Sequence, residues 1–96
     1  MNTSDVIDIL RKFKANYADK YGIKTLGLFG SFARKQQKDT SDLDVVVTLQ
    51  ESDFFILVAI KEELEKLTNY KVDVVNFRDS LRESFKVNIL KDAIFV

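Results

Sequence analysis

The chain has 96 residues, 46% of them hydrophobic and 31% charged, a composition that predicts one globular domain (residues 1–96) and excludes a disordered chain. It contains no cysteine and no histidine, which excludes disulfides, thiol nucleophiles, serine–histidine triads and zinc sites built on these residues. Fifteen basic residues balance fifteen acidic ones, so no overall positive charge attracts nucleic acid.

The N-terminal segment lacks the apolar core of a secretory signal, and no apolar run approaches the length of a membrane span. We therefore expect a cytoplasmic protein without a membrane partner. Its chemistry must rely on carboxylates, hydroxyls, Lys and Arg side chains, backbone groups and metal ions.

The first half of the chain predicts a helix followed by two strands. Apolar residues recur at helical spacing between the polar residues Asn2–Ser4 and Gly22, which predicts the helix. Residues 24–30 read as a short buried strand that enters a turn. Residues 43–49 are apolar and β-branched, which predicts a second buried strand.

A second long helix is predicted behind Ser52 and Asp53, ending near Asn69. Four apolar residues recur there at helical spacing: Leu57, Ile60, Leu64 and Leu67. Within the same helix, the apolar run Phe54–Val58 is wider than one helical stripe. It is either buried on two sides or exposed as a docking patch for a partner or a second subunit.

The C-terminal third predicts a strand, a helix and a short apolar end. Residues 71–77 read as the third strand. Ser80 and Glu83 have the spacing of a capping box, which predicts a third helix that carries Leu81, Phe85 and Ile89. Residues 93–96 form a short edge strand or simply dock on the core.

The order of these elements predicts an α+β fold with a small mixed sheet flanked by helices. The second and third strands are joined through a helix, so they can be parallel. The first and second strands are joined by a short link, which permits an antiparallel pair.

Four residues with notable chemistry lie at the ends of the first two predicted strands. Gly30 and Ser31 close the first strand, and Asp42 and Asp44 open the second after ten intervening residues. Residues two apart in a strand project to one face, so Asp42 and Asp44 point together. Asp73 lies in the third strand between valines. If the second and third strands are neighbours, the three carboxylates converge on one side of the sheet, and they then require a cation between them.

An all-oxygen ligand set selects a hard cation, here Mg²⁺ or Mn²⁺. Mg²⁺ held by a few carboxylates, with its other positions left to water and phosphate, is typical of phosphoryl and nucleotidyl transfer. Gly30 lets the backbone approach a phosphate, Ser31 offers a hydroxyl and an N–H, and Arg34, Lys35 and Lys38 add positive charge. The two lysines can equally be a solvated charge run.

This pattern resembles the minimal nucleotidyltransferase (MNT) domains of the DNA polymerase beta superfamily. Their signature is Gly-Ser, ten residues and Asp-x-Asp, with a carboxylate on a later strand. It is matched here by Gly30, Ser31, Asp42, Asp44 and Asp73. The resemblance covers essentially the whole chain and implies the nucleotidyltransferase fold. One position departs from the family pattern, because members often carry Gly where this chain has Lys35.

The resemblance implies a transferase that moves AMP from ATP to an acceptor hydroxyl, using two Mg²⁺ ions. Asp42, Asp44 and Asp73 would be the catalytic and metal-binding residues, and Asp73 would also help to deprotonate the acceptor. Gly30, Ser31 and Arg34 would bind the nucleotide phosphates. Such domains are commonly the antitoxin half of HEPN/MNT toxin–antitoxin pairs (MntA-like antitoxins), which implies a tyrosine of a HEPN-type toxin as acceptor.

The alternative is a binding module with a vestigial site that neutralises its partner by contact. The three retained carboxylates argue against this reading, and Lys35 argues weakly for it. Modification of a small molecule would usually need a further substrate domain. A nucleic-acid acceptor is disfavoured by the zero net charge. The sequence leaves a homo-oligomer open.

Overall fold

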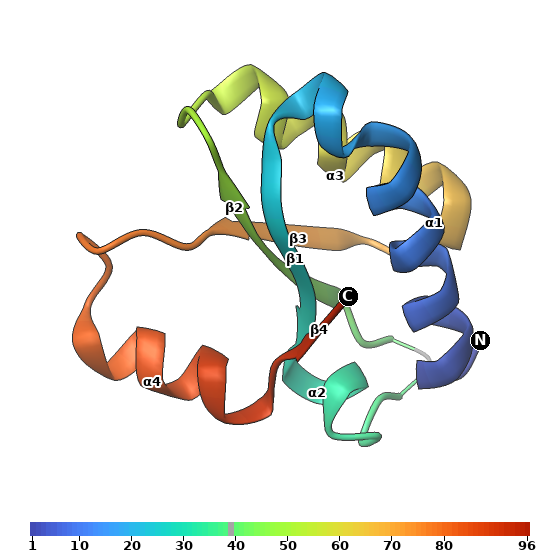
Figure 1. Ribbon diagram of the computed structural model, residues 1–96. Coiled ribbons are helices and arrows are strands. Elements are labelled where there is room, and N and C mark those ends of the chain that lie inside the picture. The colour runs from blue at the N-terminus through green and yellow to red at the C-terminus, as the bar shows by residue number, and fades with distance from the viewer. Residues whose placement is uncertain (39) are drawn as a thin grey trace.

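The computed structural model describes residues 1–38 and 40–96, and its elements surround one four-stranded sheet (Figure 1). The strand order is β3-β2-β1-β4. In chain order the elements are α1 (Thr3–Tyr21), β1 (Ile23–Phe29), α2 (Gly30–Ala33), β2 (Leu43–Leu49), α3 (Phe54–Thr68), β3 (Val72–Asn76), α4 (Glu83–Asp92) and β4 (Ile94–Phe95). Within these described residues, every helix is too short or too polar to cross a membrane.

Helix α1 confirms the predicted first helix at both ends. The Asn2 side chain accepts a hydrogen bond from the backbone N–H of Asp5, whose carboxylate accepts one from the Asn2 N–H in return. Gly22 ends the helix in the left-handed conformation, with φ of 66°. The next residue, Ile23, already belongs to β1.

The sheet is mixed, as the sequence predicts. Strands β1 and β2 are antiparallel, with Phe29 opposite Asp44. Strands β2 and β3 are parallel, with Asp44 opposite Asp73. The predicted strand 24–30 is shifted by one residue, because Gly30 already begins the short helix α2. The C-terminal apolar residues do form an edge strand, β4, which pairs with β1.

Helices α1 and α3 cover one face of the sheet and form the core with it, whereas α4 lies toward the other face (Figure 1). Leu43, Val45 and Val47 of β2 belong to this core. Because side chains alternate along a strand, Asp44 projects from the opposite face. On β3, Val72 and Val74 pack toward the core in the same way, which turns Asp73 to the face of Asp44.

Helix α3 begins and ends as predicted but exposes one residue of its predicted apolar stripe. The Asp53 carboxylate accepts a hydrogen bond from the Phe55 N–H at 2.8 Å, and Asn69 ends the helix with φ of 60°. Ile60 and Leu64 are buried, but Leu67 is 47% exposed. Leu67 therefore lies outside the buried part of this stripe.

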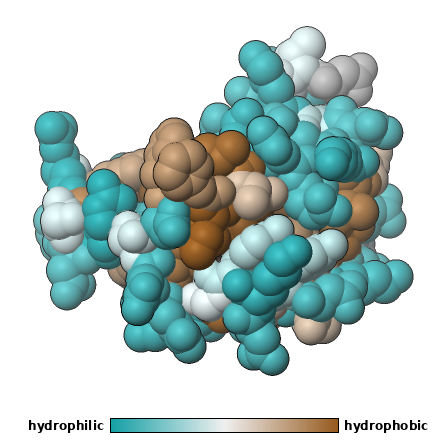
Figure 2. All heavy atoms as spheres, turned by 90° about the horizontal axis from the view of Figure 1, so that it is seen from above, coloured by the Kyte–Doolittle hydropathy of each residue, from teal (hydrophilic) through white to brown (hydrophobic). Residues whose placement is uncertain are grey.

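The apolar run at the start of α3 is exposed rather than buried on two sides. Phe54 is 72% exposed and Phe55 is 82% exposed, and their rings meet edge to face at 6.1 Å between centroids. The following residues 56–58 are half-buried. Figure 2 views the molecule from the end where α3 begins, and hydrophobic side chains gather near the centre of that face. Large exposed apolar groups of this kind are typical of contact surfaces.

Helix α4 begins later than the sequence predicts. The capping box of Ser80 and Glu83 does not open the helix, which starts at Glu83 behind Arg82. The Ser80 hydroxyl instead accepts a hydrogen bond from Nε of Arg78 at 3.1 Å. Ile89 is buried, whereas Phe85 is 39% exposed. Leu81 precedes the helix and is half-buried.

Candidate active site

Gly30 occupies a position that excludes any side chain. Its φ is 74°, in the left-handed region that favours glycine. A Cβ atom placed on Gly30 would also overlap the Oδ2 atom of Asp44. The backbone at the end of β1 therefore lies directly against the carboxylate of β2.

Asp44 and Asp73 lie side by side on the face that α1 and α3 leave open. They are opposite each other in adjacent parallel strands, so their side chains project in the same direction. Asp44 is half-buried and Asp73 is exposed. Asp42 precedes β2 by one residue and is exposed at the entrance of the strand.

The electrostatics of this cluster centre on Asp44. Burial, followed by the negative charges of Asp73 and Asp42, raises the pKa of the Asp44 carboxyl above its ordinary value. The positive charge of Arg34 acts in the opposite direction and is the weakest of these influences. The ionised site therefore has an excess of negative charge that a bound cation would relieve.

The donor set fits a hard cation. Within residues 1–38 and 40–96, no three acidic side chains come close enough to enclose a metal ion. The predicted convergence is thus clear for Asp44 and Asp73, while Asp42 acts on Asp44 from the rim of the site. Mg²⁺ commonly takes only one or two carboxylates and keeps water and phosphate oxygens as its other ligands. An open pair of carboxylates suits that coordination.

Two of the residues that the sequence predicts to bind phosphate, Arg34 and Ser31, differ in their surroundings. Arg34 follows α2, and its guanidinium donates to Oδ2 of Asp92 at 3.0 Å and to Oε1 of Gln36 at 3.2 Å. Ser31 is half-buried in α2, and its carbonyl accepts a hydrogen bond from the Gln36 N–H at 2.9 Å. Arg34 is therefore held between α2 and α4, beside Gly30.

The family of the chain follows from comparison with known proteins. The family model described as polymerase beta, nucleotidyltransferase matches residues 11–96, which is most of the chain. The chain belongs to this nucleotidyltransferase family. The enzyme class predicted from Gly30, Ser31, Asp42 and Asp44 is thereby confirmed.

Relatives and solved structures agree with this assignment. A relative from Methanocaldococcus jannaschii, provisionally named a protein adenylyltransferase, is 36% identical over 97% of this chain and 96% of its own length. Protein adenylyltransferase MntA of Thermococcus cleftensis is 27% identical over 100% of this chain and 97% of its own. A structure provisionally described as a minimal nucleotidyltransferase superposes with a TM-score of 0.79 at 26% identity, over 98% of this chain and 95% of the other. A toxin–antitoxin crystal structure with AMP-PNP shares the fold, with a TM-score of 0.72 at 21% identity, over 99% of this chain and 72% of the other.

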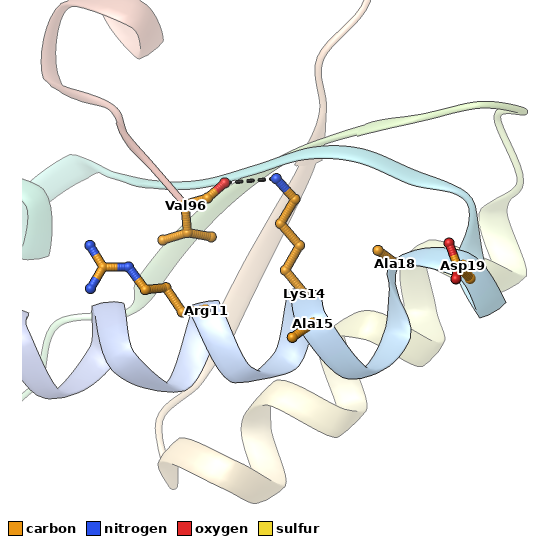
Figure 3. Close-up of a pocket in the computed structure, with 6 residues that line it drawn as sticks. All are labelled: Arg11, Lys14, Ala15, Ala18, Asp19 and Val96. Carbon is orange, nitrogen blue, oxygen red and sulfur yellow. Dashed lines mark hydrogen bonds between the residues drawn. The ribbon is translucent and has the colours of Figure 1, made fainter.

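Two pockets of the nucleotidyltransferase differ in their relation to the aspartates. One, of about 410 Å³, lies on α1 beside the last residue, where Nζ of Lys14 donates to the Val96 carbonyl at 2.8 Å (Figure 3). It includes none of the residues that the family motif singles out. The other, of about 330 Å³, lies between α2 and α4 and is bordered by Gly30 and Arg34. Only the second adjoins the motif.

The sequence analysis missed the part that α4 plays beside the site. Asp92 binds Arg34, and Phe85 and Asn88 line the pocket next to Gly30. No local signal identifies Asp92, because its contact with Arg34 joins residues 58 positions apart. Because the predicted start of α4 is wrong, the residues that share one face of this helix could not be identified from the sequence.

The position at which the family motif often has glycine, Lys35, has a backbone conformation that favours glycine. Lys35 has φ of 58°, a left-handed conformation that glycine adopts with less strain. We expect Lys35→Gly to stabilise the nucleotidyltransferase by up to about 1 kcal/mol, the gain being limited by the greater freedom of glycine in the unfolded chain. Urea unfolding measures the change, and a destabilised variant would contradict it. Lys38→Gly, also at an exposed position of the loop, serves as the comparison.

Asp44 makes stability depend on pH in a defined direction. Because the folded-state pKa is raised, the folded chain binds this proton more tightly than the unfolded chain does. The stabilisation of the folded state by this proton is complete below the ordinary carboxyl pKa of about 3.9, and it is lost as pH rises through the raised pKa of Asp44. Without metal, Asp44→Asn should therefore melt higher than the parent at pH 7, by a margin that shrinks toward pH 4. Asp19→Asn, at an exposed position of α1, should lack this pattern, and an equal pattern in both variants would refute the assignment.

Proposed function

We propose that the chain transfers AMP from ATP to a hydroxyl group of a partner protein. The observation that carries the proposal is the placement of Asp44 beside Asp73 and directly against Gly30. Two carboxylates on an open sheet face next to a close-approaching backbone suit a reaction at a phosphate group of a nucleotide. The match to the polymerase beta nucleotidyltransferase family supports the reaction type.

Asp42, Asp44 and Asp73 are the proposed catalytic and metal-binding residues. They would hold two Mg²⁺ ions, or Mn²⁺ in their place, which supply positive charge to the phosphate oxygens and lower the pKa of an attacking hydroxyl. Asp73 is the more exposed of the paired carboxylates, so it can be reached by an acceptor. We propose that Asp73 takes the proton of the acceptor hydroxyl as the oxygen of that hydroxyl forms its bond to the α-phosphorus. The bond from that phosphorus to the β-phosphate breaks, and pyrophosphate leaves.

Gly30, Ser31 and Arg34 are the proposed phosphate-binding residues. Gly30 allows the backbone of the loop to approach the nucleotide, and Ser31 offers its hydroxyl and N–H. Arg34 lies within the influence of Asp44 and is oriented by Asp92. A guanidinium in this position can balance charge on the β- and γ-phosphates without moving far from its ion pair.

The proposed acceptor is a tyrosine of a HEPN-type toxin. The names of the relatives, which are protein adenylyltransferases, support a protein acceptor. The exposed phenylalanines at the start of α3 offer a surface on which a helical partner can dock. The proposal that the partner is a HEPN-type toxin rests on the motif resemblance of Gly30, Ser31, Asp42 and Asp44, because domains with this motif commonly act as antitoxins.

Labelled ATP separates the reaction classes. The chain and the protein encoded beside its gene are incubated with Mg²⁺ and ATP labelled at the α- or the γ-phosphate. Transfer of the α label to the partner, with a matching increase of one AMP in its intact mass, is the expected result. Transfer of the γ label would indicate a kinase. The Asp42→Asn/Asp44→Asn variant is the control for enzymatic transfer, and a Tyr→Phe change at the modified position of the partner tests the acceptor.

Neutralisation of a partner by contact is the second candidate function. Phe54 and Phe55 favour it, since their exposure provides a binding surface that needs no catalysis. If the partner gains no label, and the tight complex still forms with the Asp42→Asn/Asp44→Asn variant, neutralisation by contact is the function in place of AMP transfer.

A further inference from the structure

The pocket between α2 and α4 is built from both polar and aromatic groups. It has a volume of about 330 Å³, at the small end of the range for small-molecule sites. Gly30 and Arg34 border it on the side of the phosphate loop. On α4, residues 85, 88, 89 and 92 contribute to it, which is the spacing of one helical face, and Lys91 borders it as well.

The position of this pocket on the sheet follows from the strand register. Its wall includes Phe29, which lies opposite Asp44 in the antiparallel pair of β1 and β2. Residues opposite each other in such a pair project to the same face. Along that face, Asp73, Asp44 and Phe29 therefore follow one another on three adjacent strands, and the pocket begins where Phe29 lies.

The apolar part of the lining suits an aromatic group. Phe29, Phe85 and Ile89 provide apolar surface, and the Phe85 ring is partly exposed to the pocket. Among the charged residues of the lining, Arg34 and Asp92 form an ion pair at 3.0 Å, and Lys91 adds a further positive charge. The exposed Phe85 ring in this wall is a stacking surface for a base.

Asn88 adds hydrogen-bonding capacity at the same place. It is exposed, and it borders both this pocket and an adjoining one of about 360 Å³ that also contains Phe85. A side-chain amide presents one acceptor and two donors, which matches the adjacent donor and acceptor on the edge of adenine.

We infer that the pocket between α2 and α4 binds the nucleoside of the donor nucleotide, with the base stacked on Phe85 and its edge bonded to Asn88. This inference rests on the proposed function. The nucleotide then lies across the strands, with its base at β1 and α4, its α-phosphate near Asp44 on β2 and the acceptor on the β3 side at Asp73. The neighbouring strands are about 4.8 Å apart, so this path has the scale of one nucleotide.

A single tryptophan reports on the pocket, because the chain contains none of its own. The test uses Phe85→Trp and, as control, Leu90→Trp, which places the indole at another exposed position of the same helix outside the pocket lining. With Mg²⁺ present, saturable quenching of the indole by ATP in Phe85→Trp, but not by inorganic tripolyphosphate, is expected. Neither compound should change the emission of Leu90→Trp.

Affinity measurements make the result independent of the reporter. Stacking on an aromatic ring contributes about 1–3 kcal/mol, so Phe85→Ala should weaken ATP binding by about fivefold or more in calorimetry. Tripolyphosphate binding should be unchanged, and Leu90→Ala should bind both compounds like the parent. Asn88→Ala should reduce the preference for ATP over GTP.

The outcomes that overturn the inference are separable from failure of the proposed function. If Phe85→Ala binds ATP with the affinity of the parent, and ATP leaves the emission of Phe85→Trp unchanged, the nucleoside binds elsewhere. Quenching of Phe85→Trp by tripolyphosphate would assign the pocket to the phosphates. If the parent protein binds neither ATP nor tripolyphosphate, the proposed function itself fails, and the nucleoside pocket fails with it.

Discussion

Replacing Gly30 with alanine should slow nucleotidyl transfer by roughly a hundredfold while leaving a folded but less stable protein. The left-handed conformation costs a residue with a Cβ about 1–2 kcal/mol. At Gly30 that Cβ would also overlap the carboxylate oxygen of Asp44. To relieve the overlap, either the loop or Asp44 must move, and a displacement of about 1 Å at reacting groups can cost roughly a hundredfold in rate. Transfer of labelled AMP and urea unfolding measure the two effects.

Gly22 provides the matched control for this substitution. It has φ of 66°, close to that of Gly30, but a Cβ there would meet its nearest atom, Cβ of Gln50, at 3.5 Å. Gly22→Ala should therefore show the loss of stability without the loss of activity. Equal activity in the two variants would show that contact between the loop and Asp44 has no part in the reaction.

The second large effect is the response of stability to metal and nucleotide together. Ligand at a hundred times its dissociation constant stabilises the folded state by about 2.7 kcal/mol. In a domain of this size, that corresponds to an increase in melting temperature of about 10 °C or more. The Asp42→Asn/Asp44→Asn variant should lose this increase, since it lacks the carboxylates that we assign to the cation.

A charge-matched variant makes the comparison specific. Asp19→Asn/Asp79→Asn removes the same number of negative charges at exposed positions outside the site and should respond to Mg²⁺ and ATP like the parent. A double aspartate variant at 42 and 44 that keeps the full response would refute the assignment of the site. Thermal scans with Mg²⁺ alone, ATP alone and both together separate metal binding from nucleotide binding.

The elements predicted best from the sequence are those with local signals at both ends. Helix α1 has the Asn2 cap and Gly22, and α3 has Asp53 and Asn69, so each could be bounded from neighbouring residues. The β-branched composition of 43–49 likewise determined β2, whose bounds match the prediction. For the start of α4, the serine–glutamate spacing was misleading, because the Ser80 hydroxyl binds a nearby arginine instead of a helix N–H.

The candidate site could be predicted only as far as strand pairing could. Once two strands are neighbours, alternation places Asp44 and Asp73 on one face, and the apolar residues beside them indicate which face is covered. The contact of Arg34 with Asp92 and the pocket beside Gly30 depend on how α4 packs, which no local pattern specifies. The exposure of Phe54 and Phe55 similarly depends on what lies over the start of α3.

The site combines residues that are close along the chain with one, Asp73, that is distant in sequence. Gly30 directly follows β1, and a short segment joins it to Asp44 on β2, whereas Asp73 reaches them only after the whole of α3 has crossed the sheet. Contacts between distant segments form at a higher entropic cost, and β3 is also an edge strand. Transient fraying of β3 would therefore withdraw Asp73, the proposed proton acceptor, while Gly30 and Asp44 stay assembled. Amide exchange should be faster in β3 than in β2, and a ligand that bridges the two strands should slow it, so that substrate binding itself completes the last part of the fold.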